Sequence, residues 1–135
     1  NGTKYDSLYW EGYGRGMYPE IKQGIVVSRN EATTTIRAQL AAQGFIQKEV
    51  DDFMAFWQPK LPNTPYIRLT WFGTATMDQL APLRITPRPQ TVIRTFLDFE
   101  GLQQPMQLPT QSFSKKARSG FTVTEWGGLL REGIR

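Results

Sequence analysis

The stretch TVIRTFLDF, residues 91–99, is rich in β-branched and aromatic residues and predicts a strand. One charged residue, Arg94, stands inside the apolar part of this run. A buried guanidinium without a partner costs a great deal of free energy, so Arg94 needs a carboxylate close by. The stretch therefore predicts a strand that contributes both to the core and to a buried ion pair.

Several other segments also predict strands, because they contain apolar β-branched runs or alternate between apolar and polar residues. They are GIVV, residues 24–27, YIRLTWF, residues 66–72, LRIT, residues 83–86, and FTVTEW, residues 121–126. SLYW, residues 7–10, can form one more short strand. Pro87 and Pro89 lack backbone donors, so we expect strand pairing to be interrupted between LRIT and TVIRTFLDF.

Two helices are expected between GIVV and YIRLTWF. The first covers about residues 31–42, with Ile36 and Leu40 on one face and Gly44 as its stop. The second covers about residues 47–57, where apolar residues recur at helical spacing and Pro59 follows the end. MDQLAP, residues 77–82, is expected to form a single helical turn.

These elements predict one α+β domain over residues 1–135. Its core would be a mainly antiparallel sheet of about five or six strands, with a helical hairpin packed on one face. Residues 100–119 are rich in Gln and Pro with little periodicity, so we expect an irregular surface excursion there. GGLLREGIR, residues 127–135, is expected to be a tail.

The amino-acid composition excludes several kinds of chemistry. The chain has no Cys and no His, which rules out disulfides, thiol nucleophiles, imidazole bases and metals bound by Cys or His; no cofactor is implied. The net charge is +4, but only KKAR, residues 115–118, is a dense basic cluster, so nucleic-acid binding is disfavoured. No apolar run reaches the ~20 residues of a membrane-spanning helix.

Five phrases of the sequence together resemble an uncharacterised domain family found widely in bacteria and in some microbial eukaryotes. They are LYWEG, GIVV, FWQPKLPNTPYIRLTWF, LRITPRPQTVIRTFL and RSGFTVTEWGG, and they run from Leu8 to Gly128. The corresponding family motifs are a YLFWEG-like start, a YWLPKL…NPYNLISF-like centre, PKPD…RVFM and a closing GFTVVEWGG. The resemblance implies a fold unit, and it implies no activity, cofactor or catalytic residue.

The same resemblance suggests a larger parent protein. The family segment typically follows a β-rich part that opens with a KPVIYLYP-like stretch, so this chain resembles the C-terminal portion of the family unit. Many bacterial members look secreted or surface-attached, which favours an extracytoplasmic location and a protein partner or parent chain. Two departures matter: Gln90 replaces the acid of PKPD, and Ile46 stands where a polar helix cap is usual. We therefore expect no essential carboxylate at position 90 and no such cap at position 46.

Two carboxylates, Glu11 and Glu125, stand beside Trp residues and form the candidate catalytic pair. Carboxylates can act as general acid and base on a glycan without His, and a neighbouring Trp can stack on sugars or desolvate a carboxyl group. The alternative interpretation makes Glu125 a structural anchor whose partner is Arg94. The anchor is favoured, because buried Arg–carboxylate pairs are commoner than unrecognised catalytic dyads.

Aromatic and basic residues supply the candidate binding sites. Candidates for an exposed binding face are Trp10, Tyr13, Tyr18, Arg88 and Trp126. Trp57 and Trp71 follow the apolar periodicity and are expected in the core. Arg84 and Arg88 can form a cationic patch with Lys60, although solvated surface charge is the simpler interpretation.

The leading hypothesis is a non-enzymatic binding or structural module of unknown ligand, in a larger secreted or surface protein or in an assembly. Carbohydrate is one candidate ligand. A glycan hydrolase that uses Glu11 and Glu125 is one alternative. An accessory subunit of a multiprotein complex is another.

Overall fold

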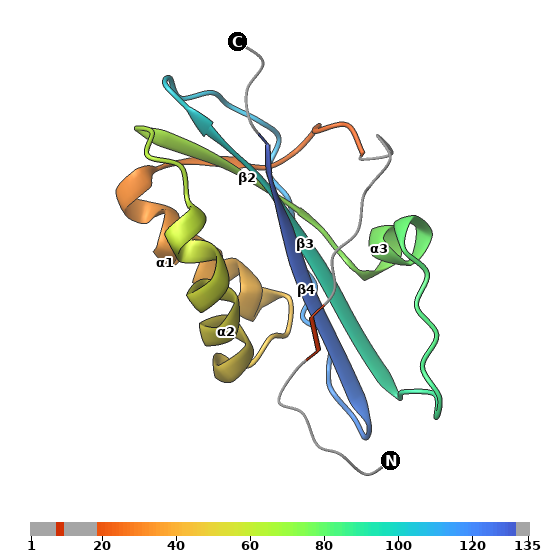
Figure 1. The fold of residues 1–135 in the computed structure, drawn as a ribbon. Coiled ribbons are helices and arrows are strands. Elements are labelled where there is room, and N and C mark those ends of the chain that lie inside the picture. The colour runs from red at the N-terminus through yellow and green to blue at the C-terminus, as the bar shows by residue number, and fades with distance from the viewer. Residues whose placement is uncertain (1–7, 10–18, 132–135) are drawn as a thin grey trace.

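The computed structural model describes residues 8–9 and 19–131, and these residues form an α+β fold (Figure 1). Three α-helices and a four-stranded mixed sheet make up the described part, together with one short 3-10 turn. In chain order the elements are β1 (Ile25–Ser28), α1 (Arg29–Ala42), α2 (Gln47–Trp57), η1 (Gln58–Lys60), β2 (Tyr66–Phe72), α3 (Thr74–Leu80), β3 (Thr91–Leu102) and β4 (Thr122–Arg131).

The strands lie in the order β1-β2-β3-β4, so neighbours in the sequence are neighbours in the sheet. β1 with β2 and β2 with β3 are antiparallel, whereas β3 and β4 are parallel. Two parallel strands need a long connection, because the chain must return to the end at which it started. Residues 103–121, which carry no helix or strand, make this return and include most of the expected irregular segment.

The sheet has fewer strands than the sequence predicted. LRIT, residues 83–86, is not a strand: the segment from Ala81 to Gln90 carries no regular structure. Pro82, Pro87 and Pro89 remove three backbone donors from this short segment, which prevents a regular ladder. Half of SLYW, residues 7 and 10, lies outside the described residues, and its described members, residues 8–9, are in no strand.

The expected tail is also wrong, because β4 continues through Gly127 and Gly128 to Arg131. These glycines are positions of close packing inside the strand. A Cβ built on Gly128 would stand 2.7 Å from Cζ2 of Trp57, so the indole ring lies directly over the backbone at this position. Glycine in a strand interior commonly marks such a close approach.

The helical hairpin of α1 and α2 covers one face of the sheet, as the sequence predicted (Figure 1). Phe53 of α2 contacts the rings of Trp71 and Trp126, and Trp57 lies edge-on to Phe99. The buried apolar core between the two layers includes Ala32, Ile36, Leu40, Val50, Phe53, Met54, Ile67, Leu69, Trp71, Ile93, Leu97 and Phe99. Trp71 is therefore in the core, as expected, whereas Trp57 is half-buried and packs against the core.

The start of α2 shows how a missing cap is replaced. Ile46 is the N-cap residue and has no side-chain acceptor, as the sequence indicated. Instead, Glu49 reaches back, and its Oε1 accepts the Ile46 N–H at 3.0 Å. This contact satisfies one of the unpaired donors at the helix start.

Candidate functional site

The face of the sheet opposite α1 and α2, which we call the distal face, holds buried charges. Alternate residues of a strand point to opposite faces, so Arg94 and Asp98 of β3 lie on the distal face while Ile93 and Leu97 lie in the core. Arg68, Arg94 and Asp98 are all buried. In Figure 1, α3 lies on the side of the sheet opposite the hairpin.

Arg94 forms the ion pair that the sequence predicted. Its side chain is only 1% exposed, and its Nε lies 2.8 Å from Oε1 of Glu125, whose side chain is 15% exposed. The parallel register places these two residues directly opposite each other on β3 and β4. A second carboxylate, Asp78 of α3, lies 3.0 Å from Nη1 of Arg94 and is 58% exposed. The guanidinium therefore links α3 to β4 across β3.

The backbone of Arg94 is also held by a side chain. β2 ends at Phe72, opposite Phe96, so the first residues of β3 have no β2 neighbour. Thr74, in the first turn of α3, fills this place: its Oγ1 accepts the Arg94 N–H at 3.0 Å and donates to the Arg94 carbonyl oxygen at 3.4 Å. The backbone N–H and C=O of Arg94 are thus both hydrogen-bonded.

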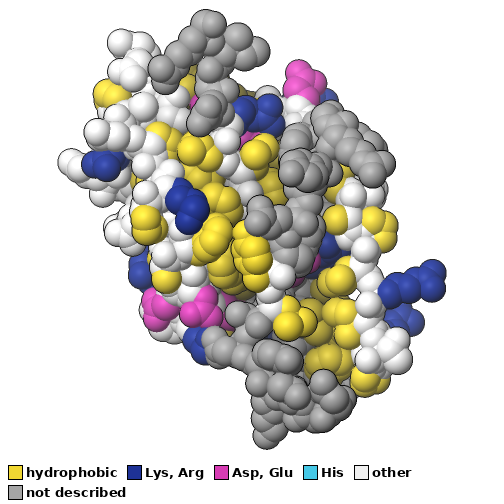
Figure 2. Space-filling view, in the orientation of Figure 1, with side chains coloured by type: hydrophobic (Ala, Val, Ile, Leu, Met, Phe, Trp, Pro, Cys, Tyr) yellow, Lys and Arg dark blue, Asp and Glu magenta, His cyan; other side chains and the backbone are white. Residues whose placement is uncertain are grey.

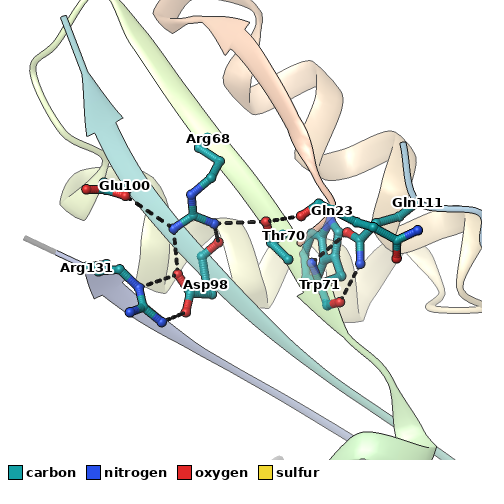
Figure 3. A network of polar contacts seen from close by, with 8 residues as sticks. All are labelled: Gln23, Arg68, Thr70, Trp71, Asp98, Glu100, Gln111 and Arg131. Atoms are coloured by element: carbon teal, nitrogen blue, oxygen red, sulfur yellow. Dashed lines mark hydrogen bonds and ion pairs between the residues drawn. The ribbon is translucent and has the colours of Figure 1, made fainter. Parts of the chain in front are cut away.

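A second ionic group surrounds Asp98, whose side chain is completely buried (Figure 3). Arg68 Nη2 lies 2.7 Å from Asp98 Oδ1, and Arg131 Nη2 lies 2.6 Å from Asp98 Oδ2. Glu100 lies 3.6 Å from Arg68 Nη2. Arg68 also donates to the hydroxyl of Thr70 at 2.9 Å. One carboxylate therefore joins β2, β3 and β4 on the distal face.

Sequence reasoning missed the Arg68–Asp98 pair, although the signal was present. YIRLTWF and TFLDF each place one charged residue in an otherwise apolar strand, as TVIRTFL does with Arg94. Two opposite charges in strands that pair with each other indicate a buried ion pair. The third member, Arg131, could not be found in this way, because its segment was expected to be a tail.

These contacts bear on the candidate catalytic pair. Glu125 is bound to Arg94, in the geometry expected of a structural anchor. Glu11 lies outside the described residues, so the Glu11–Glu125 pair stays a prediction. Trp10, Tyr13 and Tyr18 also lie outside the described residues, so their proposed role in binding stays a prediction too.

Trp126 and Arg88 are the two binding candidates that the structure describes. Trp126 is half-buried, and its ring centroid lies 5.3 Å from that of Phe53 and 6.0 Å from that of Phe56, so it packs against α2. Arg88 is exposed in the segment between α3 and β3. The structure therefore does not bring these two residues together into one site.

A cleft with a volume of about 400 Å³ opens where β2 ends. Trp71, Ile93 and Phe113 give it apolar walls, and the segment with Ser112 and Ser114 forms one side. No Asp or Glu is among the described residues that line it. Sequence reasoning missed this cleft, because it depends on where β2 stops and on an irregular segment without periodicity.

The segment that forms one side of the cleft, residues 111–116, is hydrogen-bonded to the sheet at both ends. Gln111 acts as a substitute strand neighbour: its Oε1 accepts the Trp71 N–H at 2.8 Å and its Nε2 donates to the Trp71 carbonyl at 2.7 Å. Further along, Lys116 Nζ donates to the Val92 carbonyl at 2.9 Å. The side chains of Gln111 and Lys116 therefore bind residues 111–116 to the backbone of both β2 and β3.

Glu49 of α2 links Arg118, which follows this segment, to the helical hairpin. It pairs with Arg118, whose Nε also donates to the Gly44 carbonyl at 3.2 Å, and it accepts the hydroxyl of Thr124 at 2.7 Å. Burial by itself would raise the pKa of Glu49. The hydrogen bonds from Arg118, the Ile46 N–H and Thr124 outweigh this effect, so the pKa lies below its ordinary value.

A smaller hollow of about 270 Å³ lies beside the segment that follows α3. Its lining consists of Asp78, Pro82, Leu83, Ile85, Pro89 and Val92. Figure 2 shows hydrophobic side chains gathered at the lower right, over this part of the molecule, with Lys or Arg side chains at the outer edge.

In the part of the chain that the structure describes, no group of three or more acidic residues could hold a metal ion. None of the described helices is long and apolar enough to cross a membrane. Comparisons with family models, with curated proteins and with solved structures each returned no match to this chain. The resemblance to the uncharacterised family therefore stays a prediction.

Proposed function

We propose that this domain is a non-enzymatic binding module, part of a larger protein or of an assembly. Its sheet serves as a rigid support, and the cleft at the end of β2 receives the ligand. The secreted or surface location expected from the sequence belongs to the same proposal.

The chemistry of the cleft carries this proposal. Its described lining contains hydrogen-bonding groups and apolar walls, but no carboxylate that could act as an acid, base or nucleophile. The two ionisable groups in the lining are Arg94 and Lys116. Arg94 is bound to Glu125 and Asp78, and Lys116 donates to the Val92 carbonyl. These features favour binding of a ligand over its conversion.

The buried ion pairs give the cleft a fixed frame. Asp98 joins three strands, and Arg94 joins β3, β4 and α3. Binding sites gain affinity when their groups are held in place before the ligand arrives, because less conformational entropy is lost on binding. The ion pairs on the distal face are therefore interpreted as structural supports of a preformed site.

The lining also defines a class of ligand. Trp71 and Phe113 favour an apolar or planar group, and the hydroxyls of Ser112 and Ser114 favour a hydrogen-bonding one. Lys116 adds one positive charge, so a neutral or singly anionic ligand fits better than a cation. Small sugars and acylated amino acids share these properties.

The test is a two-dimensional NMR titration of the full chain with disaccharides, N-acetylated amino acids and small carboxylates in turn. We expect a ligand to shift the amides of Gly73, Thr74 and residues 112–116, and the spectrum of the ligand itself to stay unchanged over a day. Ser114→Trp should fill the cleft and abolish the shifts. Gln103→Trp, at an exposed position outside the cleft lining, should not.

Two results would contradict the proposal. Conversion of a titrated ligand into a product would show catalysis and would favour the hydrolase. Absence of any saturable shift in the cleft across the whole panel would show that the cleft is not a ligand site, which would leave a purely structural role in an assembly.

A further inference from the structure

The segment between α3 and β3 exposes large apolar side chains. Leu80 is 39% exposed and Leu83 is 44% exposed, although leucine is usually buried in a folded domain. Phe121, also partly exposed, is joined to this segment, because its N–H and C=O bond to Gln90. Leu80 and Leu83 therefore stand at the start of this segment, and Phe121 is bonded to its end.

This surface is shaped to receive a side chain. Leu83, Ile85, Pro89 and Val92 line the hollow of about 270 Å³, which is room for one or two apolar side chains of a partner. Pro82, also in the lining, has a fixed φ, as Pro89 has, so the wall of the hollow loses little backbone freedom when a partner binds.

Two cations, Arg84 and Arg88, adjoin lining residues of the hollow in the sequence. Arg84 and Arg88 are both exposed, and the described residues provide neither with an ion-pair partner. The one carboxylate in the lining, Asp78, is paired with Arg94. A partner with negative charges close to an apolar side chain would therefore meet both unpaired arginines.

We propose that this hollow, together with Arg84 and Arg88 beside its lining residues in the sequence, docks an acidic segment of another protein that inserts a large apolar side chain. The inference goes beyond the proposed function, since it concerns a second surface and a macromolecular partner. An apolar hollow with two cations next to its lining residues in the sequence fits an apolar residue flanked by Asp or Glu. A nucleic acid backbone would use the arginines but would leave the hollow unfilled.

The test begins with the full chain and a displayed library of random peptides about a dozen residues long. We expect the selected peptides to combine Leu, Phe or Met with flanking Asp or Glu. The affinity of a selected peptide, measured by fluorescence anisotropy, should fall about tenfold or more in Leu83→Ser, as for a central contact of an interface. In Arg88→Glu the affinity should also fall, and its dependence on salt should become weaker.

Matched controls separate a local effect from a general one. Met106→Ser removes an equally exposed apolar side chain elsewhere, and Lys22→Glu makes the same change of charge near β1. Both should bind the peptide as the wild type does. Leu80→Ser gives a second apolar test if Leu83→Ser alters the thermal unfolding curve.

Several results would overturn the inference. One is a selection in which no peptide is enriched. Another is a selected peptide that binds Leu83→Ser and Arg88→Glu as tightly as it binds the wild type. A third is that the wild type binds phosphatidylserine vesicles and Arg88→Glu does not, which would assign the surface to an anionic membrane. Self-association in sedimentation that Leu83→Ser abolishes would assign it to a second copy of the chain. The NMR titration of the cleft uses different residues, so it can succeed or fail independently.

Discussion

Arg94 and Glu125 face each other across the parallel pairing of β3 and β4, with 2.8 Å between Nε and Oε1. The contact lies where β3 has lost its β2 neighbour, and Thr74 and Asp78 of α3 complete the surroundings of Arg94. A charge placed inside an apolar strand is thus bound from two elements. Arg94 therefore fixes the positions of α3 and β4 relative to β3. Because Thr74 of α3 and Arg94 itself line the cleft, these contacts also fix that wall.

Asp98→Asn should destabilise the fold strongly, because it leaves Arg68 buried with reduced compensation. Removing one partner of a buried pair typically costs about 3–5 kcal/mol. Urea denaturation of the variant and the wild type measures the change. The paired replacement Arg68→Met with Asp98→Leu should recover much of the loss. This account would be contradicted if the double variant lost as much free energy of unfolding as Arg68→Met and Asp98→Leu lose in total as single variants.

Gly128→Ala should also destabilise the fold, because the new methyl group would stand 2.7 Å from the ring of Trp57. Crowding of this kind costs about 1–3 kcal/mol. Gly127→Ala is the matched control in the same strand: its methyl group would meet Phe96 at an ordinary 3.4 Å, so stability should stay within about 0.5 kcal/mol of the wild type. Thermal unfolding of both variants gives the comparison, and equal effects would refute the close packing of Trp57.

Glu49→Gln should lower stability at neutral pH by about 1–2 kcal/mol, because it weakens the contact with Arg118. The pKa of Glu49 is lowered in the folded state, so its ionised form stabilises the fold above the ordinary value of 4.5. This contribution is lost as the pH falls through the lower folded-state pKa. The difference between variant and wild type should therefore shrink in acid, as measured by denaturation across that range.

Asp52→Asn is the control for that experiment, since Asp52 forms only an exposed pair with Lys48. Its effect should stay below about 0.5 kcal/mol at every pH. A constant difference between Glu49→Gln and the wild type from neutral to acid pH would mean that the carboxylate charge contributes nothing.

The local elements could be predicted from the sequence, because their signals are local. The helix expected over residues 47–57 and the strand expected over residues 66–72 have the bounds that the structure shows. The pair of Arg94 with Glu125 could also be predicted, since a buried charge must have a partner. No local signal, however, distinguishes a parallel from an antiparallel neighbour for β3.

Other features depend on contacts that only the folded chain makes. Gly127 and Gly128 weaken strand propensity, so the sequence indicated a tail, yet Gly128 is small because Trp57 lies over it. The cleft likewise requires β2 to stop at Phe72 and Gln111 to continue its edge. Neither event leaves a periodic pattern in the sequence.

The central claim is that the carboxylates of the distal face are structural supports of a binding module. Denaturation of Glu125→Gln tests it most directly, with Asp78→Asn as control because both carboxylates bind Arg94 but Asp78 is 58% exposed. We predict a loss of about 2–4 kcal/mol for Glu125→Gln and less than about 1 kcal/mol for Asp78→Asn. A Glu125→Gln variant as stable as the wild type, or more stable, would contradict the claim, because a carboxylate retained for catalysis commonly costs stability.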